Sequence, residues 1–138
     1  IGITPEACSS WFLPKLVGFQ TALEWCYTGE ILLPETLFRE RFAKEICEPE
    51  ELLTKAKEFA QKLVQHSQVS MALTRQMLYR NSALDHPLKA HEIDSLSIFY
   101  ASLSAGKEGV KSFLEKRAPE FTDKASTDMP DFYPWWTD

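Results

Sequence analysis

Apolar residues at helical spacing are the feature that most constrains the fold of this chain. The clearest stripe follows Pro49 and runs to about Gln65, and its members are Leu52, Ala56, Phe59, Ala60, Leu63 and Val64. Residues three and four apart lie on one face of an α-helix, so the spacing predicts an amphipathic helix. Alternating patterns typical of strands are scarce. The sequence therefore predicts a mainly α fold.

Turn and capping residues predict where the other helices begin and end. Gly29 is suited to end a helix in left-handed backbone, and Pro34 and Pro87 are suited to begin two others. Ser104 is expected to cap the last helix, which reaches Arg117. The remaining expected helices cover residues 9–17, 20–27 and 69–80.

The apolar positions of the later helices predict which faces turn inward. On the helix over residues 69–80, the expected inward positions are Val69, Ala72, Leu73 and Met77. On the helix that begins at Pro87 they are Leu88, Leu96, Phe99 and Leu103, and Ile93 and Tyr100 widen this apolar stripe. On the last helix they are Val110, Phe113 and Leu114. After Ala118, prolines disfavour helix, yet the segment is rich in aromatic residues. We therefore expect an irregular tail that docks on the rest of the chain.

Composition excludes several classes of protein. A net charge of −5 argues against a nucleic-acid-binding surface, and no apolar run approaches the roughly 20 residues of a membrane span. We expect no membrane partner and a cytoplasmic location. The three cysteines, Cys8, Cys26 and Cys47, are expected to be buried reduced thiols. His86 and His91 lack the four-residue spacing of a helical zinc motif, so no metal site is predicted.

The opening segment carries the best chemical candidate. Residues 1–15, IGITPEACSSWFLPK, describe a loop that enters a helix with one carboxylate, Glu6, at its mouth. Trp11 and Phe12 are expected to shield this carboxylate from water, as a general base requires. The alternative is that Glu6 only stabilises the positive end of the following helix.

Three segments together resemble the crotonase family, the enoyl-CoA hydratases and isomerases: residues 1–15, residues 23–29 (LEWCYTG) and residues 107–121 (KEGVKSFLEKRAPEF). The resemblance runs from residue 1 to about residue 121 and corresponds to the second half of a family member. It implies the helical C-terminal portion of an α/β spiral fold, with the β-spiral half absent from this chain. The chain is accordingly expected to be a fragment, inactive alone, of an enzyme that forms trimers or hexamers.

The resemblance also implies a division of the chain. Residues 1–66 would border the acyl-CoA pocket, residues 67–118 would form a helical trimerisation region, and residues 119–138 would be the irregular tail. The substrate would be a CoA thioester, with no separate cofactor.

Three site residues follow from the resemblance. Glu6 matches the proton-shuttling glutamate of the peroxisomal-type enoyl-CoA isomerases, whereas both hydratase glutamates and both oxyanion donors of the family lie upstream. Phe113 and Lys116 match residues that approach the adenine and phosphate end of CoA, often from a neighbouring subunit. For these two, the alternatives are a core phenylalanine and a lysine that complements the helix dipole. A different class of function, a noncatalytic helical self-association module, also remains open.

One position departs from the family pattern. Arg41 lies near a glycine of the family that adopts left-handed backbone. Because arginine is sterically disfavoured at positive φ, we expect the preceding helix to run on or the loop to be reshaped.

Overall fold

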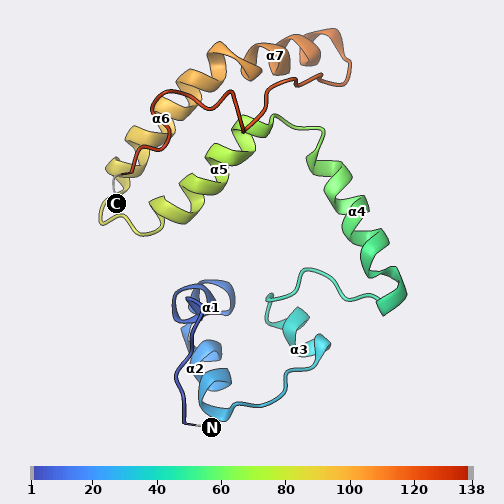
Figure 1. Cartoon of the computed structure of the whole chain (residues 1–138), viewed down its shortest axis with the longest axis vertical. Coiled ribbons are helices and arrows are strands. Elements are labelled where there is room, and N and C mark those ends of the chain that lie inside the picture. Colours follow the sequence, from blue (N-terminus) through green and yellow to red (C-terminus); the bar gives the residue numbers. More distant parts are fainter. Residues whose placement is uncertain (1, 137–138) are drawn as a thin grey trace. The chain divides into compact units, whose positions relative to one another are not determined.

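The structure is a computed structural model that describes residues 2–136, and this part of the chain is helical with no strand (Figure 1). Its elements are α1 (Ser9–Val17), α2 (Phe19–Thr28), α3 (Pro34–Arg39), the 3₁₀ helix η1 (Pro49–Glu51), α4 (Leu52–Leu63), α5 (Gln68–Asn81), α6 (Pro87–Leu103) and α7 (Ala105–Glu115). The mainly α prediction is confirmed. None of the described helices is long and apolar enough to cross a membrane.

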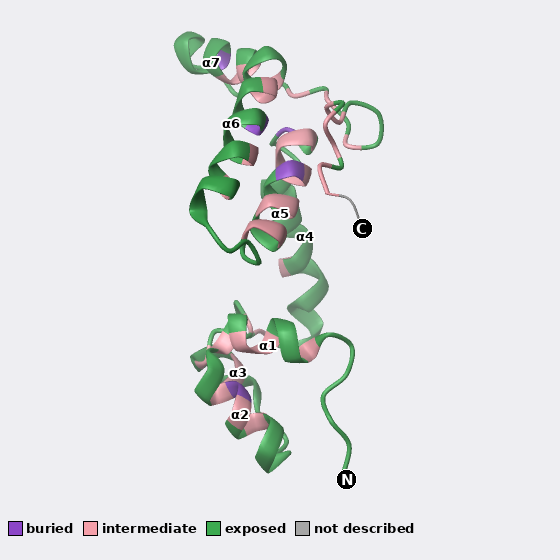
Figure 2. Cartoon of the chain, turned by 90° about the vertical axis from the view of Figure 1, so that its left-hand side faces the viewer, coloured by how far each residue is buried: buried purple, intermediate pink, exposed green. Residues whose placement is uncertain are grey.

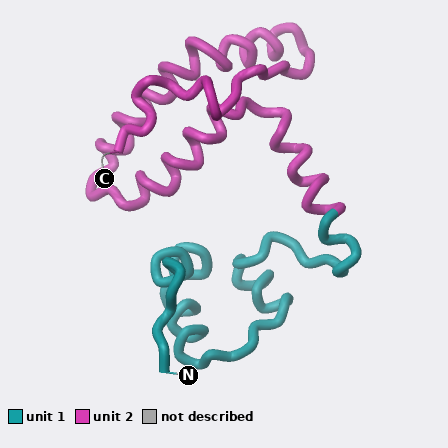
Figure 3. Tube along the Cα trace, in the orientation of Figure 1, with its two compact units in different colours: residues 1–53 teal, residues 54–138 magenta. Residues whose placement is uncertain are grey.

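The chain divides into two compact units, residues 1–53 and residues 54–138 (Figure 3). The division falls in the first turn of α4. Few residues are buried in either unit, as Figure 2 shows. The functional division at residues 66 and 118 stays a prediction.

In the first unit, α1 packs against α2 across the single residue Gly18. Gly18 has φ 83° and donates its N–H to the Pro14 carbonyl, which ends α1. Ala22 is buried on α2. Gly29 ends α2 with φ 62° and donates its N–H to Trp25, so the predicted left-handed cap is confirmed.

Arg41 adopts the conformation that the sequence argued against. α3 ends at Arg39, and Arg41 has φ 63°. The N–H of Phe42 reaches back to the Leu37 carbonyl at 2.8 Å, which closes the helix end around Arg41. The helix therefore does not run on, and the closing hydrogen bonds offset the steric cost of a side chain at positive φ.

In the second unit, α5 and α6 form an antiparallel pair and α7 packs on the end of α6 (Figure 1). Leu73 of α5 is 3% exposed, as predicted for the inward face of that helix. The prediction for α6 is confirmed in part: Ile93 and Tyr100 lie on the packed face with Ser97, but Leu88, Leu96, Phe99 and Leu103 are exposed. Ser97 is 5% exposed, because a small side chain lets the helices approach closely.

The helix ends of the second unit follow local rules with one exception. The Nδ1 atom of His86 accepts from the Leu88 N–H and so caps α6, which begins at Pro87 as expected. Ser104 precedes α7, but its hydroxyl does not cap that helix. It donates instead to the carbonyl of Tyr100 at 3.2 Å, because that acceptor lies one turn back on α6.

The tail docks on the second unit, as its aromatic residues predicted. The Asp123 carboxylate accepts from the Ser67 hydroxyl at 2.6 Å and from the Val69 N–H at 2.8 Å, which caps the start of α5. Further along, the Phe132 ring lies 5.1 Å from the Tyr100 ring. Arg80 lies 3.4 Å from the centre of a Trp136 ring. The tail is therefore held at both ends of α5.

The cysteines correct another expectation. All three are free thiols, but Cys8 and Cys26 are exposed and Cys47 is half-buried. These short helices leave the two thiols outside the small interior of the first unit.

Two of the described helices carry apolar faces that are exposed. On α4 and at Val64 just after it, the predicted stripe is exposed throughout. On α7, the predicted inward residues Val110, Phe113 and Leu114 are all exposed. Such surface is typical of a site of association with other protein.

We expect the 138-residue chain to self-associate when purified, because association removes these apolar faces from water. Light scattering at tens of micromolar protein measures the mass directly. The expected mass exceeds the 15.8 kDa of one chain. A clean monomer at that concentration would contradict the expectation.

Candidate functional site

Glu6 lies on a tightly folded loop that enters α1. Its carbonyl accepts from the Ser9 N–H at 2.9 Å and from the Ser9 hydroxyl at 2.5 Å. The next two residues, Ala7 and Cys8, have φ values of 52° and 59°. Consecutive left-handed residues other than glycine are costly, and such backbone gathers at functional sites.

The Glu6 side chain does not act as a cap of α1. The N-cap residue is Cys8, the helix has no side-chain cap, and its first turn holds no acidic residue. The Glu6 side chain is exposed, and Trp11 and Phe12 are themselves 37% and 40% exposed. The predicted shielding by these two rings is therefore not found within the described residues.

Phe113 and Lys116 lie together at the end of α7. The Lys116 N–H donates to the Phe113 carbonyl at 3.2 Å. Phe113 is 82% exposed, so the alternative of a core residue is wrong. Lys116 is exposed and is the C-cap residue of α7, in left-handed backbone with φ 54°. Glu6 belongs to the first unit, whereas this pair belongs to the second.

Sequence reasoning missed the ion pair that closes the end of α7. Arg117 donates to both carboxylate oxygens of Glu108, at 2.6 and 3.0 Å, and its Nε atom lies 2.7 Å from Glu115. Glu108 also accepts from the Glu120 N–H at 2.8 Å. Glu108 and Arg117 are nine residues apart, outside the spacing at which side chains meet on one helix. Only the reversal of the chain after α7 brings them together.

This pair changes the acidity of both groups. The hydrogen bonds from Arg117, followed by the Glu120 N–H, lower the pKa of Glu108 to about 2. The same contacts with Glu108 and Glu115 raise the pKa of Arg117 above its usual value. Both groups therefore stay charged at neutral pH.

The depressed pKa of Glu108 predicts a pH dependence of stability. A group with a lowered folded pKa stabilises the fold above its unfolded pKa, here 4.5, and loses that contribution as pH falls toward 2. We expect Glu108→Gln to lower the melting temperature at pH 7, with the difference from the parent shrinking below about pH 4.5. Circular dichroism melts across pH 2–7 measure this. Glu92→Gln, at an exposed position of α6, is the control. A difference that did not change with pH would contradict the expectation.

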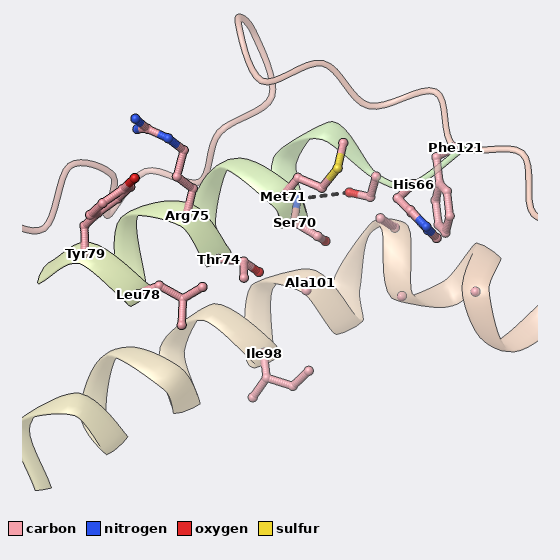
Figure 4. A pocket seen from close by; sticks show the side chains of 14 residues that line it. His66, Ser70, Met71, Thr74, Arg75, Leu78, Tyr79, Ile98, Ala101 and Phe121 are labelled. Atoms are coloured by element: carbon pink, nitrogen blue, oxygen red, sulfur yellow. Dashed lines mark hydrogen bonds between the residues drawn. The ribbon is translucent and has the colours of Figure 1, made fainter. Parts of the chain in front are cut away.

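The second unit also contains an open apolar groove of about 830 Å³ beside α5 and α6 (Figure 4). Thr74 and Leu78 extend from α5 toward α6, while Arg75 and Tyr79 point away from α6. Gly106 also lines it, and an added Cβ there would lie 2.8 Å from the Ala101 carbonyl oxygen. The groove includes none of the three predicted site residues.

Histidine chemistry is confined to local structure. His91 lies 3.4 Å from the Ser95 hydroxyl on its own helix, and Asp94 accepts from Asn81 at 3.3 Å. Asp94 thus links α6 to α5, whereas the His91 contact stays within α6. Among residues 2–136, no three His, Cys, Asp or Glu side chains gather closely enough to hold a metal ion.

Comparisons with known proteins agree on one family. The sequence model of the enoyl-CoA hydratase/isomerase family matches residues 1–124. The chain is 38% identical over 125 residues to the enoyl-CoA hydratase ACTT3 of Alternaria alternata, covering 88% of this chain and 42% of that protein. It is 30% identical over 125 residues to the crotonyl-CoA hydratase of Syntrophomonas wolfei, covering 90% and 48%.

A solved structure shows the same fold. The crystal structure of an enoyl-CoA hydratase from Bacillus anthracis superposes with a TM-score of 0.82 at 22% identity, covering 89% of this chain and 48% of that one. The chain thus spans less than half the length of these relatives. With the family match extending over residues 1–124, the chain belongs to the enoyl-CoA hydratase/isomerase family of the crotonase superfamily.

Proposed function

We propose that this chain supplies the helical C-terminal portion of an enzyme that acts on acyl-CoA thioesters by proton abstraction and enolate stabilisation. The observation that carries the proposal is the family match over residues 1–124, which includes both the Glu6 loop and the end of α7. The oxyanion donors of such an enzyme would lie in the part of the relatives that this chain does not span.

Glu6 is proposed as the base of an isomerisation. To move a double bond from position 3 to position 2, one carboxylate takes a proton from carbon 2 and returns it at carbon 4, so a single group suffices. The family match over the Glu6 loop supports this role, and the Glu6 side chain does not cap α1. Hydration by upstream glutamates is the other reaction of this class.

Phe113 and Lys116 are proposed as contacts of CoA. An exposed aromatic ring can stack on adenine, and an ammonium group can bind phosphate. Their exposure and their shared turn support this assignment.

The proposed enzyme is a cytoplasmic homo-oligomer, a trimer or hexamer, that needs no cofactor besides its CoA thioester and has no nucleic-acid or membrane partner. The uncovered faces of α4 and α7 support self-association. The alternative of a noncatalytic self-association module accounts for these faces but not for the family match, so it is not favoured.

Coenzyme A binding tests this proposal. We expect Phe113→Ala and Lys116→Gln each to weaken CoA binding by about 5- to 30-fold in the protein that carries this chain, since each removes a contact of about 1–2 kcal/mol. Isothermal titration calorimetry measures the affinity. Lys57→Gln, on the exposed face of α4, should leave it unchanged. Unchanged affinity in both α7 variants would contradict the proposed contacts.

A further inference from the structure

The turn after α7 has an unusual residue at its critical position. Lys116 has φ 54° and ψ 39°, a left-handed conformation in which glycine or asparagine is usual. The Lys116 N–H bonds to Phe113, and the Arg117 N–H bonds to the Ser112 carbonyl at 3.1 Å, which completes a Schellman motif. Glycine would satisfy this backbone without strain, so a lysine here points to a need for its side chain.

An ion pair between the side chains of Glu108 and Arg117 bridges this turn. Glu108 lies in the first turn of α7, and Arg117 follows Lys116 directly. Their two-point hydrogen bond, at 2.6 and 3.0 Å, ties the residue after the turn to the beginning of the helix. Glu108 also fixes the Glu120 N–H at 2.8 Å, beyond the turn. Such paired hydrogen bonds restrict orientation more than a single contact does.

A second turn in the chain provides a comparison. Arg41 has φ 63° after α3, with the same pattern of closing backbone bonds. The nearby Arg39–Glu40 ion pair joins neighbouring residues at 2.9 Å and spans no turn. Left-handed backbone at a cationic residue thus occurs twice among residues 2–136, and at Lys116 an ion pair spans the turn.

We propose that Glu108 and Arg117 are positioning residues that hold Lys116 in its left-handed conformation and so fix the direction in which its side chain leaves the backbone, toward the phosphate end of CoA. The ligand part rests on the proposed function. The conformational part stands on the turn itself.

The conformational part is tested by melting temperatures. Lys116→Gly should raise the melting temperature by several degrees, because glycine removes the strain of positive φ. In a Glu108→Gln background the gain should shrink, because the turn is no longer held in that conformation. Arg41→Gly is the matched control, and its gain should be the same with or without Glu108→Gln. An equal gain from Lys116→Gly in both backgrounds would overturn the proposal.

The ligand part is tested by comparing CoA with 3′-dephospho-CoA in calorimetry of the protein that carries this chain. The parent should prefer CoA, and Lys116→Asn, which tolerates the turn but lacks the ammonium group, should lose the preference. Glu108→Gln should reduce the preference several-fold while Lys116 is still present. Glu92→Gln, at an exposed position of α6, removes one negative charge away from this turn and should leave the preference unchanged.

The outcomes distinguish the role of Lys116 in CoA binding from its positioning by Glu108 and Arg117. A parent that binds both ligands equally would contradict the proposed role of Lys116 in CoA binding, and the melting temperatures would still decide whether the turn is held. A parent that prefers CoA, with the preference intact in Glu108→Gln, would overturn the positioning role alone.

Discussion

Glu6→Gln should lower isomerase turnover by roughly a hundredfold to ten-thousandfold in the protein that carries this chain, the usual contribution of a positioned general base. Glutamine keeps the size of the side chain but cannot take a proton from carbon 2. CoA affinity should barely change, because the proposed CoA contacts lie on α7. Steady-state rates with a 3-enoyl-CoA, together with calorimetry of CoA binding, measure both quantities.

The alternative role of Glu6 predicts a different result. If the carboxylate only favoured the start of α1, its loss would cost about 1 kcal/mol of stability or less and leave the chemistry intact. Glu24→Gln, at an exposed position of α2, controls for the loss of one negative charge in the same unit. Isomerase turnover unaltered by Glu6→Gln would remove Glu6 from the mechanism and favour hydration by upstream glutamates.

The second large effect concerns the 138-residue chain by itself. We expect it neither to hydrate crotonyl-CoA nor to isomerise a 3-enoyl-CoA above background, because it spans less than half of its relatives and would lack their oxyanion donors. Loss of a single such donor typically costs a hundredfold or more. Spectrophotometric assays of the purified chain test this.

Turnover by the purified chain would be informative in its own right. It would mean that Glu6 finds hydrogen-bond donors for the thioester oxygen within these residues. Turnover that persisted in the Glu6→Gln chain would instead indicate a contaminating enzyme, so that variant is the control.

Local signals predicted where most helices begin and end. The expected helix over residues 9–17 agrees with α1 at both ends, and Gly29, Pro34 and Pro87 lie where glycine and proline stabilise helix ends. These signals act within a few residues of chain, so neighbouring sequence is enough to interpret them.

The packed faces were harder to predict. Leu88, Leu96, Phe99 and Leu103 form the more apolar face of α6, yet they are exposed, and Ser97 lies against the interior. Hydrophobicity alone favours the leucine face, but a close helix pair requires small side chains at the contact. The burial of Ser97 was therefore not predicted, because it depends on a partner helix that the local pattern does not reveal.

The candidate site was likewise predicted in part from the sequence and revealed in part only by the structure. The motif around Phe113 and Lys116 identified the family from the sequence, and Glu6 was recognised from its loop. The Glu108–Arg117 pair and the left-handed backbone of Lys116 appeared only in the structure.

The sequence by itself determined the helical class, most helix ends and the family, because these depend on short-range patterns and on motifs of consecutive residues. The tertiary structure alone decided which face of α6 is buried, how Asp123 caps α5 across 54 residues, and how Arg117 reaches back to Glu108. The physical reason is that each of these contacts joins residues outside one helical turn, so it exists only after the chain has reversed direction.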